Sequence, residues 1–371
     1  TVTTHQWAVM KNNSLGWLVA MCIAPSQQAG IKAETLVFSG VGKMDSEIAA
    51  ALKQNIGQFN IESEEELYAI NEIAKKQGKI ANIAIRINPD IDAKTHPKIS
   101  TGLRNNKFGI AYPQAIELFK QAKQMEAIQA SSIAIHIGSQ IMTLDPLRNA
   151  YHRLRDFYET LKSNAIPITS LDIGGGVGIA YHQNEYSPSC DDWAHLIHKV
   201  LGDLPVKIHL EPGRSIVGNS GVLLSRVIRI KKQYGKNFAI LDCAMNDLMR
   251  PALYESYHQM LHIKKENSND TLKRYDVVGP ICESTDCFLR DYICTKLTPN
   301  DLVCFTHAGA YSAVMANQYN SRPLIGEILI NGSNIINAKP QKNIQQEIDI
   351  EKQQNWADIA TLLNKNEPKS L

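Results

Sequence analysis

Two short segments carry residue types that together could hold an anionic group. A run of three glycines, 174–176, follows Asp172, and the sequence Glu-Pro-Gly-Arg occupies 211–214. Successive glycines let backbone N–H groups approach phosphate oxygens closely, and Arg214 can add a charge-assisted contact. For the glycines alone, the alternative is an ordinary turn between a strand and a helix. Taken together, the two segments predict a phosphate site.

Two further polar side chains stand at the ends of apolar runs. Glu211 follows the run 206–210, where an unpaired carboxylate would be costly, so we expect a cationic partner. A protonated pyridine nitrogen would serve and would make a bound ring a better electron sink; the simpler alternative is a salt bridge to Arg214. His136 ends the run 133–135 and precedes a Gly-Ser pair. Such a histidine is often a core residue, but the Gly-Ser pair suits a phosphate or a flat ring close to the backbone.

The elements that position these residues recur at intervals of one strand plus one helix. Helical stretches such as 63–77 and 113–125 separate seven short β-rich runs, at 7–9, 36–39, 59–62, 82–88, 132–136, 171–173 and 207–211. This alternation favours βαβ crossovers and a parallel sheet. A closed (β/α)8 barrel needs eight strands, and we expect the missing one between 17 and 35. In such a barrel the loops after the last two strands build the phosphate site, which is where the glycines and Arg214 fall.

The pattern changes after Gly218. Alternating segments without long amphipathic helices between them lie at 221–230, 237–242, 274–278 and 302–306, which is typical of an antiparallel β domain. The length of 371 residues also favours two domains. We therefore predict an α/β protein with a (β/α)8 TIM-type barrel at 1–218 and a mainly antiparallel β domain at 219–371. From Lys339 onward we expect a solvated end with one helix at 356–363.

Composition restricts the class of protein and its partner. Apolar residues make up 44% and charged residues 20% of the chain, a globular balance, and no apolar run approaches the ~20 residues of a membrane-spanning helix. The net charge of +2 gives no field that favours nucleic acid, so we expect a small-molecule partner. Seven cysteines without a CxxC pair argue against disulfides and structural zinc and favour a reducing cytoplasmic location. Because the first residue is Thr1 and nothing resembles a signal peptide, we expect the natural N-terminus to be missing from this sequence.

Several longer strings are more specific. They are RINPDIDAKTHPKISTGLRNNKFGI at 86–110, HIGSQ at 136–140, DIGGGVGI at 172–179, EPGRSIV at 211–217, MNDLMRPALY at 245–254, VVGPICESTD at 277–286 and GAYSAVMANQYNSRP at 309–323. In this order the strings resemble the diaminopimelate decarboxylase family, which belongs to the alanine-racemase-like, fold-type III group of pyridoxal-phosphate enzymes. The resemblance extends from residue 36 to residue 323.

The resemblance implies pyridoxal 5'-phosphate as the cofactor and assigns its contacts. His136 would stack on the cofactor ring, and Ser139 would lie on the phosphate side. Glu211 would bond the pyridine nitrogen, where racemases of this fold type have an arginine, and this difference favours decarboxylation. Further cofactor contacts would come from Gly174, Gly175, Gly176, Gly213, Arg214 and Tyr311.

The resemblance also implies meso-diaminopimelate as the substrate, with L-lysine and carbon dioxide as products. The implied substrate residues are Arg214, Arg250, Tyr254, Glu283 and Tyr311. Two arginines and a tyrosine suit the distal carboxylate, and Glu283 would hold the distal ammonium. Cys282 matches a cysteine that reaches the partner subunit's site and is assigned as proton donor, so the resemblance implies a homodimer with shared active sites. Outside this pattern, Arg250 would be read as a surface ion pair and Cys282 as a small core residue.

The match breaks near the start of the chain. Family members hold the cofactor on a lysine in a strand-one motif resembling YAVKAN, whereas this chain has WAVMKNN at 7–13 and places Lys11 one position later. A one-residue slip turns a side chain to the opposite face unless a bulge corrects it. A segment resembling GFDIVS-x-GEL is also absent, as are the residues that precede strand one in the family. Missing residues, a lost modified lysine or an inactive relative would each explain this; the intact downstream motifs favour missing residues, and Lys11 stays the candidate.

Two other functions remain open on the sequence alone. One is a related decarboxylase of ornithine, lysine or carboxynorspermidine, and Arg250 discriminates because a distal carboxylate needs a cation whereas a distal ammonium prefers an acid. The other is a non-catalytic protein that carries or senses pyridoxal phosphate, which the irregular region around Lys11 motivates. A covalent adduct after borohydride treatment would separate an enzyme-like linkage from loose binding.

Overall fold

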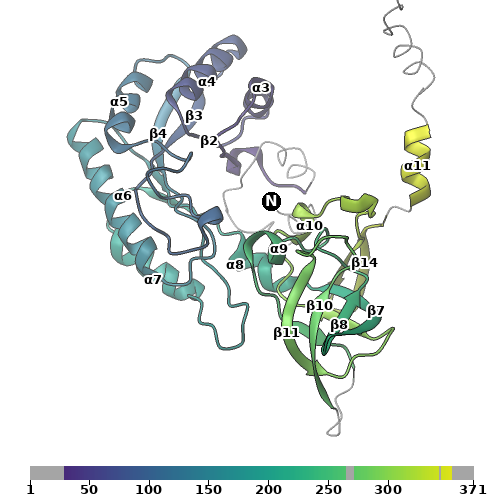
Figure 1. The fold of residues 1–371 in the computed structure, drawn as a ribbon. Coiled ribbons are helices and arrows are strands. Elements are labelled where there is room, and N and C mark those ends of the chain that lie inside the picture. The colour runs from purple at the N-terminus through teal and green to yellow at the C-terminus, as the bar shows by residue number, and fades with distance from the viewer. Residues whose placement is uncertain (1–28, 265–270, 342–343, 353–371) are drawn as a thin grey trace, which may run out of the picture.

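The first part of the molecule is a parallel sheet of six strands that lie side by side in sequence order. The structure is a computed structural model that describes residues 29–264, 271–341 and 344–352. The strands are β1 Val37–Phe38, β2 Gln58–Ile61, β3 Ala81–Arg86, β4 Ile128–Ala134, β5 Ser170–Asp172 and β6 Lys207–His209. The helices between them form an arc along one side of the sheet in Figure 1: α3 Asp45–Lys53, α4 Glu64–Gln77, α5 Tyr112–Ala122, α6 Asp145–Ser163 and α7 Cys190–Leu201. Sequential strands with helices on one side are how a (β/α) barrel is wound.

Helix α4 illustrates why these segments are helical. The Ser63 hydroxyl accepts the backbone N–H of Glu66 and caps the first turn, which carries three glutamates, and two lysines stand in the last turn. Gly78 ends the helix in the left-handed conformation, at φ 62°. The side chains turned toward the sheet are buried, namely Leu67, Ile70, Asn71 and Ala74. Local capping and burial therefore favour the same element.

The predicted fold class is confirmed, and the strand count differs. Each predicted run from residue 36 onward contains part of a strand, with shifted ends. The run 7–9 lies outside the described residues, as does Lys11. Of the region 17–35, where an eighth strand was expected, residues 29–35 are described and form a 3-10 turn, Ala33–Thr35. Within the described ranges the sheet is thus an open half of a TIM-type barrel and not a closed ring.

The second part is a β domain built on a sheet of order β11-β10-β8-β7-β12-β9. Its strands are β7 Leu223–Gln233, β8 Lys236–Leu241, β9 Met260–His262, β10 Leu272–Val278, β11 Cys287–Thr295 and β12 Leu302–Phe305. Neighbours are antiparallel except β8 and β10, which run parallel. A parallel pair needs a long connection, and here the chain passes through α9 Arg250–Tyr254 and β9 between the two strands. The antiparallel expectation therefore holds for four of these five pairings.

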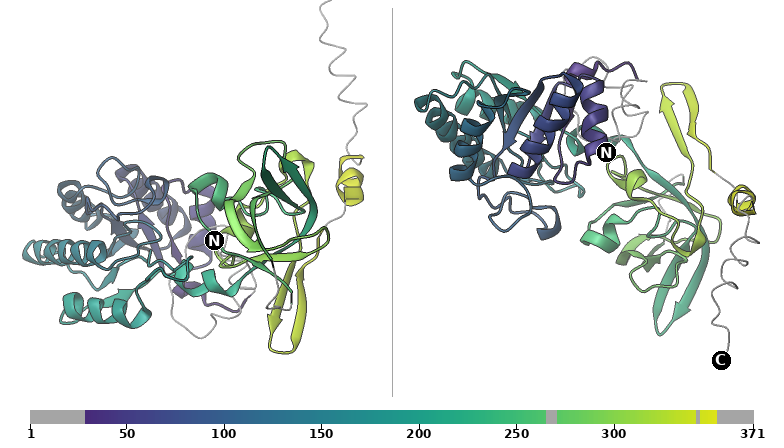
Figure 2. Two further views of the ribbon diagram at one scale, coloured as in Figure 1. Left: turned by 60° about the horizontal axis from the view of Figure 1, so that its bottom comes forward. Right: turned by 90° about the horizontal axis from the view of Figure 1, so that it is seen from above.

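A two-stranded hairpin follows the β domain. It consists of β13 Glu327–Asn331 and β14 Asn334–Lys339, joined by a turn with Gly332 at φ 61°. The hairpin projects from the domain (Figure 2) and exposes most of three isoleucines: Ile328 69%, Ile330 68% and Ile335 73%. Helix α11 Ile344–Lys352 comes next, where a solvated end was expected, and the helix predicted at 356–363 lies outside the described residues.

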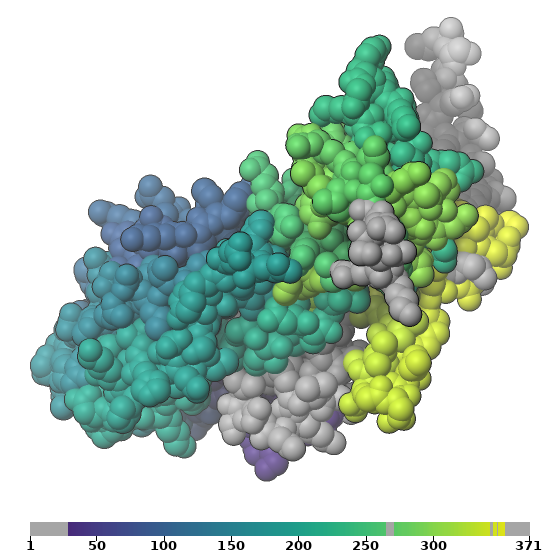
Figure 3. Space-filling view, turned by 90° about the horizontal axis from the view of Figure 1, so that it is seen from below, coloured from purple at the N-terminus to yellow at the C-terminus, as the bar shows by residue number. Residues whose placement is uncertain are grey.

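A short joint connects the two parts. Helix α8 Arg214–Val217 and the turn Gly218–Ser220 lead from β6 into β7. At this joint a Cβ on Gly309 would lie 1.9 Å from the carbonyl oxygen of Val217, so only glycine allows the backbones to approach this closely. Figure 3 shows the barrel residues and the β-domain residues in contact on one face of the molecule. This seam brings β-domain side chains to the ends of the barrel strands.

Candidate active site

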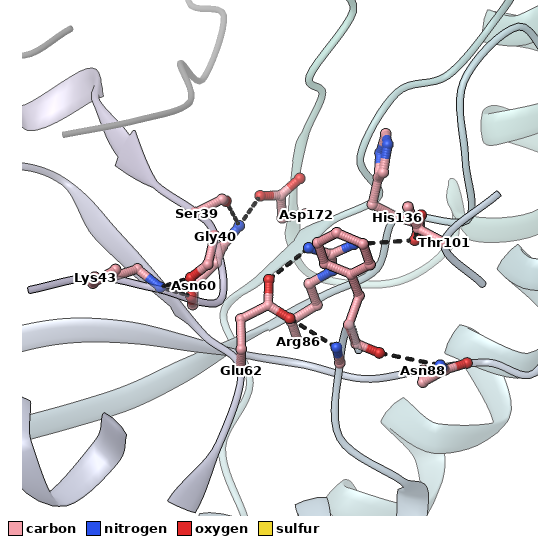
Figure 4. A network of polar contacts seen from close by, with 12 residues as sticks. Ser39, Gly40, Lys43, Asn60, Glu62, Arg86, Asn88, Thr101, His136 and Asp172 are labelled. Carbon is pink, nitrogen blue, oxygen red and sulfur yellow. Dashed lines mark hydrogen bonds and ion pairs between the residues drawn. The ribbon is translucent and has the colours of Figure 1, made fainter. Parts of the chain in front are cut away.

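Polar side chains gather at the carboxyl ends of the parallel strands, where active sites of barrel proteins lie. They are Ser39 after β1, Asn60 and Glu62 at the end of β2, Arg86 on β3, His136 after β4, Asp172 on β5 and Glu211 after β6. Figure 4 shows all of these except Glu211 facing one region at the strand ends. Because each strand contributes at least one of them, the sheet itself fixes their relative positions.

Two carboxyl groups meet at the ends of β5 and β6. Asp172 and Glu211 affect each other's pKa, and Asn60 donates to Asp172 at 2.9 Å and to the Ser39 hydroxyl at 2.8 Å. Burial raises the pKa of Asp172, and burial together with the Asp172 charge raises the pKa of Glu211 well above its usual value. Among the described residues no cation forms an ion pair with Glu211, and the alternative of a salt bridge to Arg214 is not formed. The raised pKa values favour a proton on this pair.

His136 presents a neutral, oriented ring. The backbone N–H of Gly175 donates to its Nδ1 at 3.3 Å, which leaves the imidazole proton on Nε2. Desolvation, followed by the nearby charge of Arg86, lowers the pKa of His136 to about 3. Thr101 donates to the His136 carbonyl oxygen at 2.9 Å and fixes the backbone. The half-buried ring can therefore pack against a flat ligand without carrying charge.

A buried ion pair supports this histidine. Glu62 Oε1 lies 2.6 Å from Arg86 Nη1, and Glu62 Oε2 accepts the backbone N–H of Gly109 at 2.7 Å. Arg86 also donates to the carbonyl oxygen of His136 at 3.4 Å and lies over the ring of Phe108, 4.9 Å from its centroid. Removing one member would leave an uncompensated buried charge. The pair ties the loop at 108–109 to the ends of β2 and β3 and to His136.

The glycine run allows the strand ends to approach one another. A Cβ on Gly174 would lie 2.9 Å from His136 Nδ1, and one on Gly175 would lie 2.1 Å from the Glu211 carbonyl oxygen. Gly176 has φ 101° and packs against the Gly138 carbonyl oxygen, 2.2 Å from an added Cβ. The N–H of Gly174 already donates to Asp172 and that of Gly175 to His136. These glycines therefore position His136 and Glu211, a role beyond the predicted phosphate contacts.

Arg214 lies where the barrel meets the β domain. It is 5% exposed; Nη1 donates to the Tyr181 hydroxyl at 2.6 Å and Nη2 to the Ser139 hydroxyl at 3.2 Å. Its guanidinium also lies 4.7 Å from the ring centroid of Tyr311, whose φ of 68° is uncommon for a residue other than glycine. The Nε atom of Arg214 has no hydrogen-bond partner. The structure thus brings three predicted site residues together, Arg214, Ser139 and Tyr311.

Arg250 is buried and lies close to Tyr181. The residue is 3% exposed, and its guanidinium lies 4.6 Å from the Tyr181 ring centroid. It bonds His258 Nε2 at 2.8 Å and donates to the Ser256 hydroxyl at 3.2 Å. Burial, and then the charge of Arg214, lower the pKa of Arg250. The alternative of a surface ion pair for Arg250 is therefore wrong.

The remaining predicted residues form two separate groups. Tyr254 lies beside His96 of a barrel loop, with ring centroids 5.8 Å apart. Glu283 is exposed and accepts hydrogen bonds from the hydroxyls of Thr285 and of Tyr319, the latter at 2.9 Å, and these two hydrogen bonds lower its pKa. Cys282 is exposed too and accepts from Asn320 at 3.1 Å, so it is not a core residue. In the part of the chain that the structure describes, no hydrogen bond joins Cys282 or Glu283 to the barrel side of the site.

Several site residues were not singled out from the sequence. Glu62, Arg86 and Asp172 each stand at the end of a buried strand, the signal that was applied to Glu211, so the same rule could have found them. Tyr181 and His258 carry no such signal, because both lie in irregular segments and meet only when the two parts of the chain are folded together.

Comparison with known proteins agrees with this geometry. The family model of the pyridoxal-dependent decarboxylase pyridoxal binding domain matches residues 22–218. A diaminopimelate decarboxylase of Zymomonas mobilis is 40% identical over 329 residues, 88% of this chain and 77% of the relative. One of Neisseria meningitidis serogroup B is 44% identical over 322 residues, which cover 86% of this chain and 76% of the relative.

The fold of solved relatives is the same. The crystal structure of Helicobacter pylori diaminopimelate decarboxylase complexed with L-lysine matches with a TM-score of 0.89 and 39% identity over 94% of this chain and 87% of that one. A diaminopimelate decarboxylase from M. jannaschii in co-complex with L-lysine matches with a TM-score of 0.86 and 33% identity, over 92% and 80% of the two chains. Sequence, fold and the arrangement of charged residues at the strand ends place this chain in the diaminopimelate decarboxylase family of pyridoxal-dependent decarboxylases.

Proposed function

We propose that this chain decarboxylates meso-diaminopimelate to L-lysine and carbon dioxide with pyridoxal 5'-phosphate as its cofactor. The observation that carries the proposal is that two buried guanidiniums contact Tyr181. Arg214 donates to its hydroxyl, and Arg250 lies over its ring. Neither forms an ion pair with any described carboxylate. Two buried positive charges without protein counter-ions call for anionic ligands. A cofactor phosphate and a substrate carboxylate supply two anions.

The residues at the strand ends fit pyridoxal phosphate. Next to Gly213 there is open space, since the nearest atom to an added Cβ is the Tyr311 hydroxyl at 4.0 Å, and Arg214 Nε lacks a partner. We assign the phosphate to Ser139, Gly213, Arg214 and Tyr311 with the glycine run, the ring face to His136 and the ring nitrogen to Glu211. When bound, the cofactor takes up the electron pair left by departing carbon dioxide. Glu211 keeps the ring nitrogen protonated, because its carboxylate stabilises the positive charge there.

The substrate assignment follows from Arg250. Its remaining N–H groups can fork onto the carboxylate at the end of the substrate that does not react. Tyr254 would border this end. Glu283 would hold the distal ammonium, and Cys282 would give a proton to the carbon that has lost carbon dioxide.

We further propose that Cys282 and Glu283 act in the partner's site within a homodimer. Both are exposed in this chain and lie in the loop that leads into β11, and among the described residues their hydrogen bonds run only to neighbouring β-domain residues. Exposed reactive side chains suit a role across a subunit interface. In this arrangement residues 1–218 supply most of the cofactor contacts, and residues 219–371 supply Tyr311 together with substrate and interface residues.

Turnover tests the proposal directly. Purified chain with pyridoxal phosphate should release carbon dioxide and L-lysine from meso-diaminopimelate and should leave L-ornithine unreacted. Arg250→Ala should lose most activity, whereas Arg229→Ala, on an exposed position of β7, should keep it. Turnover of ornithine in preference to diaminopimelate would move the assignment to a related decarboxylase.

The lysine that holds the cofactor needs its own measurement. We keep Lys11 as the candidate, although it lies outside the described residues. Borohydride reduction of the loaded protein followed by peptide mass analysis should place the cofactor mass on Lys11, and Lys11→Ala should abolish it while the exposed Lys32→Ala does not. An adduct on another lysine would replace Lys11, and only non-covalent binding would favour a carrier of pyridoxal phosphate.

A further inference from the structure

His258 holds one defined tautomer. It is 1% exposed, its Nδ1 lies 2.9 Å from the Thr306 carbonyl oxygen, and its Nε2 lies 2.8 Å from Arg250 Nη1. A carbonyl oxygen only accepts, so Nδ1 must carry the proton. A guanidinium only donates, so Nε2 must accept. The two contacts together require a neutral imidazole with its proton on Nδ1.

The surroundings of His258 keep it neutral. The charged and titratable groups facing it are Arg250, Arg214 and His307, together with the Tyr181 ring, whose centroid is 5.1 Å from its own. No described carboxylate makes an ion pair with His258. Desolvation outweighs the Thr306 hydrogen bond and lowers the pKa of His258 to about 4, and the two arginines act in the same direction. At neutral pH His258 is therefore an uncharged acceptor.

A neutral acceptor has a different effect on Arg250 from that of an acid. Carboxylates are the usual partners of buried arginines, and such a partner would satisfy the charge inside the protein. Here His258 and Ser256 take one N–H each, and the Tyr181 ring covers one face of the guanidinium. The orientation is fixed while the positive charge stays uncompensated. The remaining N–H groups are available to an anionic ligand.

His258 also lies where the β domain contacts a barrel loop. It follows Tyr257, whose ring stacks on His182 of the barrel at 3.8 Å between centroids, and Tyr181 and His258 form the adjacent ring pair. Thr306, whose carbonyl oxygen accepts the hydrogen bond from Nδ1–H, directly follows β12. The histidine is thus anchored from the β domain and from the barrel loop at 181–182. This anchoring gives Arg250 a fixed place relative to the barrel residues.

We propose that His258 is a positioning residue of the substrate site, which fixes the Arg250 guanidinium without neutralising it so that Arg250 selects ligands with a distal carboxylate. The inference rests on the proposed function and deepens it, because it explains how one buried arginine keeps its charge for the substrate. His258 itself touches neither the substrate nor the cofactor in this role.

Two matched substitutions distinguish the positioning of the Arg250 guanidinium from the neutralisation of its charge. His258→Gln offers Arg250 a neutral acceptor, whereas His258→Glu offers a charged one. Binding of L-lysine, which keeps the distal carboxylate, and of cadaverine, which lacks it, is measured by calorimetry on the loaded protein. We expect wild type and His258→Gln to prefer L-lysine to similar extents, and His258→Glu to lose about tenfold of that preference. The exposed His152→Gln serves as the surface control.

Steady-state kinetics provide the second readout. His258→Glu should raise the KM for meso-diaminopimelate by about tenfold with a smaller change in kcat. The contact to the distal carboxylate is weakened equally in the bound substrate and in the transition state, so the chemical step itself changes little. An unchanged ratio of L-lysine to cadaverine affinity in a folded His258→Glu protein would overturn the role of His258 alone. A wild-type protein that neither prefers L-lysine nor turns over meso-diaminopimelate would overturn the proposed function and this inference with it.

Discussion

At the scale of single residues, the acid pair of Asp172 and Glu211 makes an unusual prediction about stability. Burial and the Asp172 charge hold the pKa of Glu211 well above its usual value in the chain without cofactor. The folded chain therefore keeps a proton that the unfolded chain releases above about pH 4.3. Since the folded state binds more protons, stability falls as pH rises from that value toward the folded pKa of Glu211. In the cofactor-free protein, the buried acid pair therefore lowers the free energy of unfolding most at alkaline pH.

Glu211→Gln should reverse this effect. The amide keeps the shape of the side chain and has no charge to bury, so we expect a higher unfolding midpoint than wild type at pH 8, with a gain of about 1 kcal/mol that shrinks toward pH 5. Scanning calorimetry of the cofactor-free proteins measures it, with the exposed Glu126→Gln as control. The same variant should lose at least about a hundredfold in turnover, because an amide cannot stabilise a protonated ring nitrogen. A lower midpoint for Glu211→Gln at pH 8 would contradict the raised pKa.

The residue types of the site were largely predictable, but their partners were not. Glu211 stands at a strand end, as the sequence suggested, and Arg214 and Ser139, both predicted at the phosphate, lie within hydrogen-bond distance of each other. The sequence could not show that Glu211 faces Asp172 and not Arg214, because the pairing depends on the lateral order of β5 and β6. Nor could it show that Arg250 is held by His258. That contact joins side chains eight residues apart across an irregular turn in which Glu255 has a positive φ.

At the scale of elements, we expect alanine to have different effects on stability and on cofactor binding at two glycines of the site. Gly175→Ala places a Cβ 2.1 Å from the Glu211 carbonyl oxygen, so the loops after β5 and β6 must separate. Gly213→Ala meets nothing closer than 4.0 Å, and Gly213 does not have a positive φ. We expect Gly175→Ala to lower the unfolding midpoint by several degrees. Gly213→Ala should keep the midpoint and weaken pyridoxal-phosphate binding about tenfold, equivalent to roughly 1.4 kcal/mol. Equal losses of midpoint in both variants would show that the space beside Gly213 is structural.

Strand prediction succeeded where periodicity is regular and failed where the sheet is irregular. The strands β1, β2 and β5 are buried throughout, and all six parallel strands lie in short apolar runs, which gave their positions within a few residues. Strand β11 was missed because its pairing with β10 has register shifts and Asp291 within it has φ 50°. Strand β9 was missed because three residues are too few to show alternation. In each case local geometry broke the pattern on which the prediction depends.

At the scale of the whole molecule, the exposure of Cys282 predicts complementation between subunits. If Cys282 serves the partner's site and Arg250 its own, Cys282→Ala and Arg250→Ala are each nearly inactive alone. After mixing and subunit exchange about half of the dimers are hybrids, each with one site free of both changes, so about a quarter of wild-type activity should return. A mixture of Arg250→Ala with the exposed Cys190→Ala controls for the mixing procedure, since half of its sites should be active with or without exchange. Demonstrated exchange without recovery in the first mixture would place both side chains in one site.

The hairpin of β13 and β14 has a consequence for how this protein behaves at high concentration. Its paired isoleucines Ile330 and Ile335 face water, and a two-stranded ribbon leaves strand edges open to another chain. The attraction is apolar and directional, so added salt does not screen it, and a net charge of +2 provides little long-range repulsion between copies. Solubility should therefore be limited by this ribbon and not by the stability of either core. A lysine in place of Ile330 would extend the concentration range without altering the melting temperature.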